Sequence, residues 1–215
     1  MRRAAYWALI LGALSLTADP AAAVTIDFGC LTNTLPGDCA IGESKFTVEL
    51  SDQGGGVVRF HFKNLGPEAS VLSEVYFDDG SLLALSSVDN GPGVVFAQDA
   101  SPPNLPGGQN AVPPFQVTEG FLAEALPSPA QNGAGPTEWV AIEFTLQSGQ
   151  TINDVTDQLA SGALRIGIHV IAFDSDGSES FINQPLVPIP EPGTALLICC
   201  ALLGLGTRRK LQLRS

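Results

Sequence analysis

The sequence predicts an all-β protein whose body is an antiparallel β-sandwich, with an open β-barrel as the alternative. Apolar and polar residues alternate in short segments along most of the chain, which is typical of half-buried strands. Turn-forming Gly, Asn and Asp residues separate nearly all of these segments. The 23 glycines and 16 prolines among 215 residues also argue against a helical bundle.

The strands are predicted from this alternation. In Lys45–Leu50 and Val58–Lys63 every second side chain is apolar, so each segment has one face for the core and one for solvent. Leu164–Phe173 is the longest segment of this kind. The other predicted strands are Val24–Phe28, Val71–Phe77, Leu82–Val88, Val94–Ala97, Gly120–Ala125, Trp139–Leu146 and Ser178–Ile182.

One segment has the spacing of a short helix. Ile152, Val155 and Leu159 recur at helical intervals, Thr151 is a suitable cap, and Gly162 stands just past the end. We therefore predict one helix within an otherwise β-structured body.

Two segments rich in proline and glycine, Ala100–Val117 and Leu126–Pro136, show no period and are predicted to be loops. A loop as long as the first ordinarily counts against an assignment. We expect it to pack across an edge of the sheet and shield that edge from pairing.

The first 23 residues are predicted to be a secretory signal peptide. Arg2 and Arg3 provide a positive start, Ala4–Leu16 is apolar, and Ala21–Ala23 offers small residues for cleavage. The apolar segment is too short to span a bilayer comfortably as a permanent anchor. We therefore expect export through the general secretion machinery and removal of this segment by signal peptidase.

The C-terminal end of the chain has three parts. Val187–Pro192 is proline-rich and unsuited to a helix, Thr194–Gly206 contains no charged residue, and Arg208, Arg209 and Lys210 follow directly. An apolar segment that stops at a basic cluster is typical of a stop-transfer signal with its positive end in the cytoplasm. As a helix the apolar segment reaches only about 20 Å, short of the roughly 30 Å hydrocarbon core, which favours a temporary anchor.

This three-part tail resembles the PEP-CTERM sorting signal of Gram-negative bacteria. The resemblance implies that Pro190, Glu191 and Pro192 are recognised by an exosortase, a membrane-embedded transpeptidase-like enzyme. It also implies that the apolar segment is a transmembrane helix and that the basic cluster retains it. Cys199 and Cys200, within the apolar segment, are not required by this pattern. The expected route is export, transient anchoring in the inner membrane, and transfer to the cell surface or the extracellular space.

The predicted signal peptide and the resemblance of the tail together divide the chain into a signal peptide at 1–23, an extracytoplasmic domain at 24–185 and a sorting signal at 186–215. The body also resembles a β-sandwich type that recurs among PEP-CTERM proteins. The stretches that carry this second resemblance are Val75–Gly80, Pro102–Gly108, Leu164–Val170 and Gly177–Asn183. It implies a fold but no biochemical activity.

The charge distribution excludes some functions. Residues 24–192 contain 21 acidic and four basic residues, which argues against nucleic-acid binding because phosphates require clustered Lys and Arg. The body has no phosphate-binding glycine loop and no nucleophile elbow, so we predict neither an enzyme nor a bound cofactor.

We predict a structural or interaction protein of the cell surface or extracellular matrix. The alternative is a polysaccharide- or calcium-binding module, with exopolysaccharide as a candidate partner; an exposed Trp139 beside Tyr76 would favour the sugar.

Cysteine and histidine offer few candidate sites. Cys30 and Cys39 are the cysteines that remain once both ends are removed, and outside the cytoplasm we expect them to form a disulfide that holds the N-terminal strand. His61 and His169 occupy polar positions of predicted strands. Because no ligand cluster or nucleophile accompanies them in the sequence, we interpret both as surface or interstrand residues.

An acidic turn provides the one calcium candidate. Asp174, Asp176 and Glu179 alternate with small residues, and carboxylate oxygens are ligands that Ca²⁺ prefers. A plain turn is the favoured interpretation, because Asp-Gly pairs are common in hairpins and no bidentate Glu stands at EF-hand spacing.

Overall fold

The computed structural model describes residues 23–78, 83–98, 104–118, 122–147 and 149–186. The predicted signal peptide up to residue 22, the Pro190–Pro192 motif and the Arg208–Lys210 cluster lie outside these residues. Within the described part, none of the helices has the length and apolar character needed to cross a membrane.

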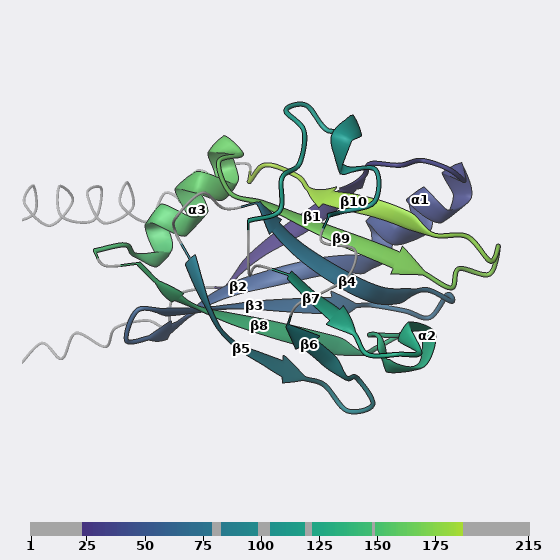
Figure 1. Ribbon diagram of the computed structural model, residues 1–215, viewed down its shortest axis with the longest axis horizontal. Coiled ribbons are helices and arrows are strands. Elements are labelled where there is room, and N and C mark those ends of the chain that lie inside the picture. Colours follow the sequence, from purple (N-terminus) through teal and green to yellow (C-terminus); the bar gives the residue numbers. More distant parts are fainter. Residues whose placement is uncertain (1–22, 79–82, 99–103, 119–121, 148, 187–215) are drawn as a thin grey trace, which may run out of the picture.

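Ten strands of the described chain form one antiparallel sheet that curls into a half-barrel (Figure 1). Its spatial order is β5-β8-β3-β2-β1-β10-β9-β4-β7-β6. A strand overlaps each predicted segment, so the predicted, mostly antiparallel β fold is confirmed. The strands are β1 (Val24–Cys30), β2 (Phe46–Gly54), β3 (Val57–Asn64), β4 (Val71–Asp78), β5 (Leu83–Asn90), β6 (Phe96–Gln98), β7 (Leu122–Ala125), β8 (Trp139–Leu146), β9 (Arg165–Ile171) and β10 (Glu179–Asn183).

Strand β1 joins the two halves of the curled sheet. One half is β5-β8-β3-β2 and the other half is β10-β9-β4-β7-β6. Its first part pairs with β2, from Val24 opposite Leu50 to Asp27 opposite Thr47. Its second part, Phe28–Cys30, pairs with β10. One strand therefore belongs to both halves, and the sheet turns there so that the two inner faces enclose a common core.

Phenylalanine rings from both halves meet in this core. Phe77 on β4 packs edge-to-face against Phe60 on β3 and Phe144 on β8, with ring centroids 5.2 and 4.7 Å apart. All three side chains are fully buried. Edge-to-face pairs contribute roughly 0.5–1.5 kcal/mol each beyond the area they bury, so these contacts help hold the halves together.

The first and last strands of the spatial order, β5 and β6, are joined by hydrogen bonds between one pair of residues. The side-chain amide of Asn90, at the end of β5, accepts a hydrogen bond from the Phe96 N–H at 2.8 Å and donates to the Phe96 carbonyl at 3.2 Å. This pair of bonds imitates the exchange between two residues of an antiparallel ladder. Asn90 thereby links β5 to β6, the first and last strands in the spatial order.

The predicted helix is present as α3 (Ile152–Ser161). Thr151 and Asp154 form a reciprocal capping box, and Gly162 ends the helix in the left-handed conformation at φ 75°. Val155 and Leu159 form the buried face of this helix, as the spacing predicts.

Helix α1 (Pro36–Lys45) was not predicted from the sequence, which indicated one helix only. Its buried residues are Asp38, Cys39, Gly42 and Lys45, which show no apolar period in the sequence. Gly42 is one of them: a Cβ atom there would lie 2.1 Å from the ring of Phe181. Pro36 starts the helix at a position where proline is favoured. The short helices α2 (Pro129–Asn132) and η1 (Gly108–Asn110) likewise fall within predicted loops.

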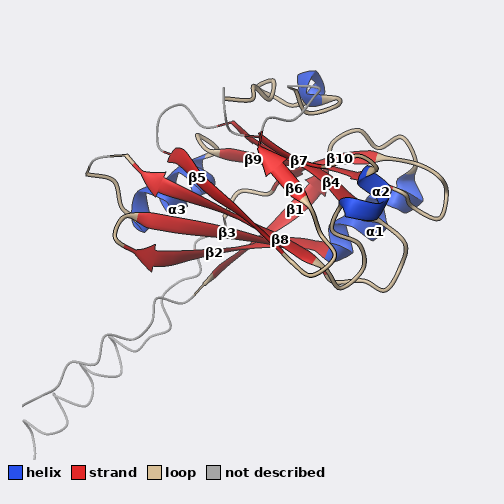
Figure 2. Ribbon diagram, turned by 60° about the horizontal axis from the view of Figure 1, so that its bottom comes forward, coloured by secondary structure: helices blue, strands red, loops and turns tan. Residues whose placement is uncertain are grey.

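Residues 104–118, called the strap below, do not shield a sheet edge as we predicted. They cross the outer face of the half that contains β4, β9 and β10, as Figure 2 shows. Leu105 and Phe115 are buried there against Tyr76. Gly167 on β9 makes this possible, because a Cβ at that position would lie 2.7 Å from Leu105 and 3.1 Å from Phe115.

Candidate functional site

The predicted disulfide is present and links Cys30 at the end of β1 to Cys39 on α1, with Cα atoms 5.4 Å apart. It therefore attaches the unpredicted helix to the first strand. Cys39 is buried and Cys30 is half-buried.

Glu179, the third predicted calcium ligand, lies beside this disulfide and is only 1% exposed. Its carboxylate accepts hydrogen bonds from the Thr32 hydroxyl and, at 2.6 Å, from the Leu35 N–H. Leu35 immediately precedes α1 and has no capping side chain of its own. Glu179 thus caps α1 from a distant strand and places its negative charge at the positive end of the helix dipole.

Two opposing effects act on the Glu179 carboxyl. Burial raises its pKa, whereas hydrogen bonds from Thr32, Thr34 and Leu35 lower it, and the net pKa lies below the ordinary value. The hydrogen bonds and the helix N-terminus compensate the buried charge without a basic partner among the described residues.

The structure does not bring Asp174, Asp176 and Glu179 together. Asp174 and Asp176 are exposed, and Asp176 adopts φ 59° within a tight turn closed by its own N–H on the Phe173 carbonyl at 2.8 Å. In the described part of the chain, the one set of three potential metal ligands within 4.8 Å is Glu179 with the two cysteines. Those two sulfur atoms are bonded to each other, so the set is a disulfide beside a capping carboxylate.

His169 belongs to a polar row on the outer face of the strap-covered half. Its Nδ1 lies 3.0 Å from Glu74 Oε2, which also accepts a 2.6 Å hydrogen bond from the Tyr76 hydroxyl. Burial, and then Glu74, raise the pKa of Tyr76. Ser180 lies opposite His169 in the register, but its buried hydroxyl has no hydrogen-bond partner among the described residues. The row therefore lacks the nucleophile–base hydrogen bond of an acyl-transfer triad.

His61 lies on β3, on the outer face of the half of the sheet that the strap does not cover. Its neighbours there are charged side chains and an aromatic ring. Its ring packs edge-to-face on Trp139 at 4.8 Å, and its Nδ1 is 4.0 Å from Glu49. Burial, followed by the charges of Lys63 and Arg59, lowers the pKa of His61. His61 is thus an interstrand residue held in its neutral form at pH 7.

Charges on this outer face are largely paired with one another. The Arg59 guanidinium binds Asp89 at 2.6 Å and Glu143 at 3.1 Å, and it lies 5.8 Å from the ring centre of Trp139. Lys63 binds Glu49 at 2.6 Å. The ion pairs surround a half-exposed tryptophan without leaving a strongly charged centre.

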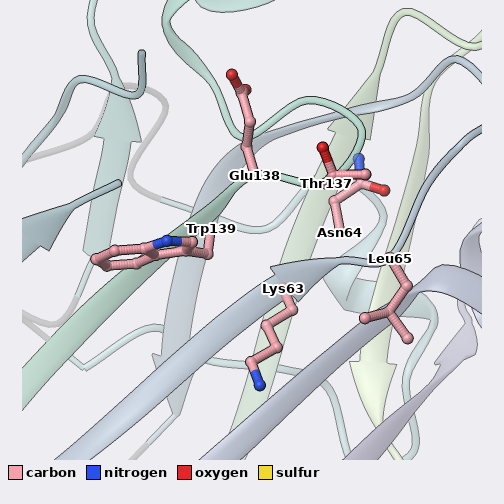
Figure 3. Close-up of a pocket in the computed structure, with 6 residues that line it drawn as sticks. All are labelled: Lys63, Asn64, Leu65, Thr137, Glu138 and Trp139. Atoms are coloured by element: carbon pink, nitrogen blue, oxygen red, sulfur yellow. The ribbon is translucent and has the colours of Figure 1, made fainter. Parts of the chain in front are cut away.

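A hollow of about 260 Å³ opens beside Trp139 (Figure 3). Trp139 and Leu65 stand on its two sides, with the aliphatic stem of Lys63 between them and Glu138 directed away. Leu65 is 54% exposed, a large fraction for a leucine. The hollow is lined by Lys63, Asn64, Leu65, Thr137, Glu138 and Trp139.

The aromatic pair that would favour sugar binding is not assembled. Trp139 lies on β8, whereas Tyr76 lies on β4 in the other half and is fully buried beneath the strap. Sequence reasoning also missed the hollow, although the isolated leucine of the polar stretch Lys63–Gly66 was its one visible signal. No family model, curated protein or solved structure matches this chain.

Proposed function

We propose that this chain is an exported structural or interaction protein of the cell surface or extracellular matrix, sorted through its C-terminal tail by an exosortase. One observation carries the proposal. The Pro190–Pro192 motif, the uncharged Thr194–Gly206 segment and the Arg208–Lys210 cluster follow one another in the order and spacing of a PEP-CTERM signal.

Features of the body support an extracytoplasmic role. A disulfide between Cys30 and Cys39 is characteristic of proteins that fold in oxidising compartments. The body is strongly acidic, which favours solubility over adhesion to nucleic acid or anionic lipid. We interpret the curled sheet, with two inner faces around one core, as a β-sandwich-type domain without catalytic activity. Its partners during export are signal peptidase, the secretion machinery and the exosortase.

The tail offers a direct test, because recognition and membrane retention reside in different residues. Glu191→Ala removes the motif's charge without a penalty to the apolar segment, so insertion should persist while processing stops. Leu202→Arg introduces a charge into the apolar segment at a cost of about 2.5–3.5 kcal/mol and should release unprocessed protein. Asp157→Ala, an exposed acidic position of α3, is the matched control.

Cell fractionation with an antibody to the body, combined with a gel shift for tail loss, separates the outcomes. We expect Glu191→Ala to accumulate in the inner membrane at the size of the chain without its signal peptide. Wild type and the Asp157→Ala control should be shorter and leave that membrane. Equal size and equal inner-membrane retention for Glu191→Ala and wild type would refute sorting and indicate a permanent anchor.

A further inference from the structure

The Cys30–Cys39 disulfide lies among carboxylates. One carboxylate oxygen of Glu179 and the two sulfur atoms all lie within 4.8 Å of one another. A second carboxylate, that of Glu43, accepts a hydrogen bond from the Cys30 N–H at 2.9 Å. In the described part of the chain the salt bridges join other residues, so neither carboxylate is neutralised by a basic side chain there. The disulfide therefore has a negative local environment.

The first turn of α1 does not offset this negative charge at the sulfur of Cys39. Thiolates of reactive cysteines are commonly stabilised by a helix N-terminus. Here the Leu35 N–H donates to Glu179. The N–H groups of Asp38 and Cys39 donate to the Leu35 carbonyl at 3.0 and 3.2 Å, and Pro36 has no N–H to donate. Glu179 thus takes the position at the helix that a thiolate occupies in a redox-active disulfide.

Reduction of a disulfide by a thiol requires two successive displacements at sulfur. Cys39 is only 6% exposed whereas Cys30 is half-buried, so an incoming thiolate reaches the Cys30 sulfur more readily. This attack forms a mixed disulfide with Cys30, breaks the Cys30–Cys39 bond and leaves its electron pair on Cys39 as a thiolate. A second thiolate then attacks the reagent sulfur of the mixed disulfide and releases the oxidised reagent. Both cysteine thiolates take up protons from solvent, so the protein disulfide is reduced while two thiols are oxidised.

Negative charge opposes both the arrival and the departure of a thiolate in the first displacement. The attacking thiolate approaches Cys30 near Glu43, and the departing thiolate forms on Cys39 beside Glu179. For two unit charges 4.8 Å apart, Coulomb repulsion at an effective dielectric constant between about 80 and about 20 changes a rate roughly fourfold to a few hundredfold. The buried Glu179 lies toward the strong end of this range and the exposed Glu43 toward the weak end.

We propose that Glu179 and Glu43 shield the disulfide from thiol reagents by electrostatic repulsion. Once formed, the cross-link between β1 and α1 resists exchange with small thiols and with the thiolates of oxidoreductases. Glu179 then has two roles, as the cap of α1 and as the charge that opposes a thiolate on Cys39. The inference goes beyond the proposed function and does not depend on the sorting tail, because it rests on contacts within the body alone.

Reduction of the purified full chain by thiols of opposite charge tests this inference. Cysteamine carries a positive charge, and 3-mercaptopropionate carries a negative charge. Each rate is measured at an ionic strength of about 0.01 M and divided by the rate of the same thiol with bis(2-hydroxyethyl) disulfide, an uncharged small disulfide. Freed thiols are alkylated, and mass spectrometry quantifies the peptides that contain Cys30 and Cys39 separately from Cys199 and Cys200. The normalised cysteamine rate divided by the normalised mercaptopropionate rate is the charge selectivity.

The charge selectivity should be greatest in wild type. Glu179→Gln should lower it at least about fivefold, and the exposed Glu43→Gln should lower it about two- to threefold. The effect of Glu43→Gln should shrink more than that of Glu179→Gln at about 0.15 M salt, because a buried charge is screened less. Asp157→Asn, at an exposed position of α3, is the control and should leave the charge selectivity unchanged.

The charge selectivity separates this role from the loss of the helix cap. Weaker capping opens the structure more often and accelerates reduction by both thiols by the same factor, which leaves their ratio unchanged. Glu43 lies outside the cap, so Glu43→Gln keeps the inference testable if Glu179→Gln does not fold.

Two results would overturn the inference. One is a charge selectivity that is the same in wild type, Glu179→Gln and Glu43→Gln. The other is a charge selectivity of wild type no greater than one. Since Glu191→Ala alters only sorting, it should keep the wild-type charge selectivity, so a failure of this inference is distinguishable from a failure of the proposed function.

Discussion

Replacing Glu179 by glutamine removes the buried charge at the start of α1 while almost preserving the size of the side chain. The carboxylate accepts hydrogen bonds from Thr32 and Leu35, and hydrogen bonds to charged groups contribute about 1.5–3 kcal/mol each. An amide retains one acceptor oxygen but turns an NH₂ group toward the second donor. We therefore expect Glu179→Gln to lower the free energy of unfolding by about 2 kcal/mol, including part of the helix-dipole term. Glu179→Ala leaves both donors unpaired and should cost about 3–5 kcal/mol.

The pH dependence of this effect has a definite sign. The folded-state pKa of Glu179 lies below its ordinary value of 4.5. The stability that its ionised form contributes is complete above the unfolded-state pKa and is lost as the pH falls through the folded-state pKa. The gap between wild type and Glu179→Gln should be constant at neutral pH and shrink below about pH 4.5.

Urea unfolding of residues 24–185, which we expect to fold without either end, measures both effects by circular dichroism. Asp157→Asn removes the same charge from an exposed position of α3 and is expected to change stability by less than about 0.5 kcal/mol. Equal stability of Glu179→Gln and wild type at pH 7 would refute the capping role. A gap that persists unchanged to pH 3 would show that the charge is irrelevant and only the shape of the side chain matters.

Three further predictions concern the sheet, the strap and the disulfide. Asn90→Ala leaves the Phe96 N–H without its partner and should lower the free energy of unfolding by about 1–3 kcal/mol, as measured by urea denaturation. Gly167→Val should force the strap outward, costing about 1–3 kcal/mol and accelerating limited proteolysis within residues 104–118, whereas unchanged cleavage would contradict the packing. Replacing both Cys30 and Cys39 by serine opens a ten-residue loop and should cost about 2.7 kcal/mol, checked against reduced wild type in the same denaturation assay.

Features that depend on local pattern could be predicted from the sequence, and those that depend on distant partners could not. Strand alternation and the α3 cap lie within a few residues, so both were found. Helix α1 buries Gly42 against Phe181, a contact that no local period reveals. The strap packs on an outer face of the sheet because Gly167 leaves space there for its side chains. A glycine within a strand indicates that another segment approaches the backbone closely, but it does not indicate which segment. Glu179 was assigned to its neighbouring turn, although its hydrogen-bond partners lie more than 140 residues away.

The sheet order connects this fold to the proposed route of export. Within the described residues β1 is the first strand and pairs with β10, the last strand. The Gln184 N–H continues this pairing by bonding the Asp27 carbonyl at 2.8 Å. If the chain is exported as we propose, the two halves of the sheet cannot be joined through β1 until nearly the whole body has crossed the membrane. Pairings of such long sequence separation form slowly. In the proposed route, a segment that holds the C-terminal end at the membrane during this interval would keep the chain in place until β1 and β10 have paired. Slow pairing of these two strands would then be the physical purpose of the proposed temporary anchor.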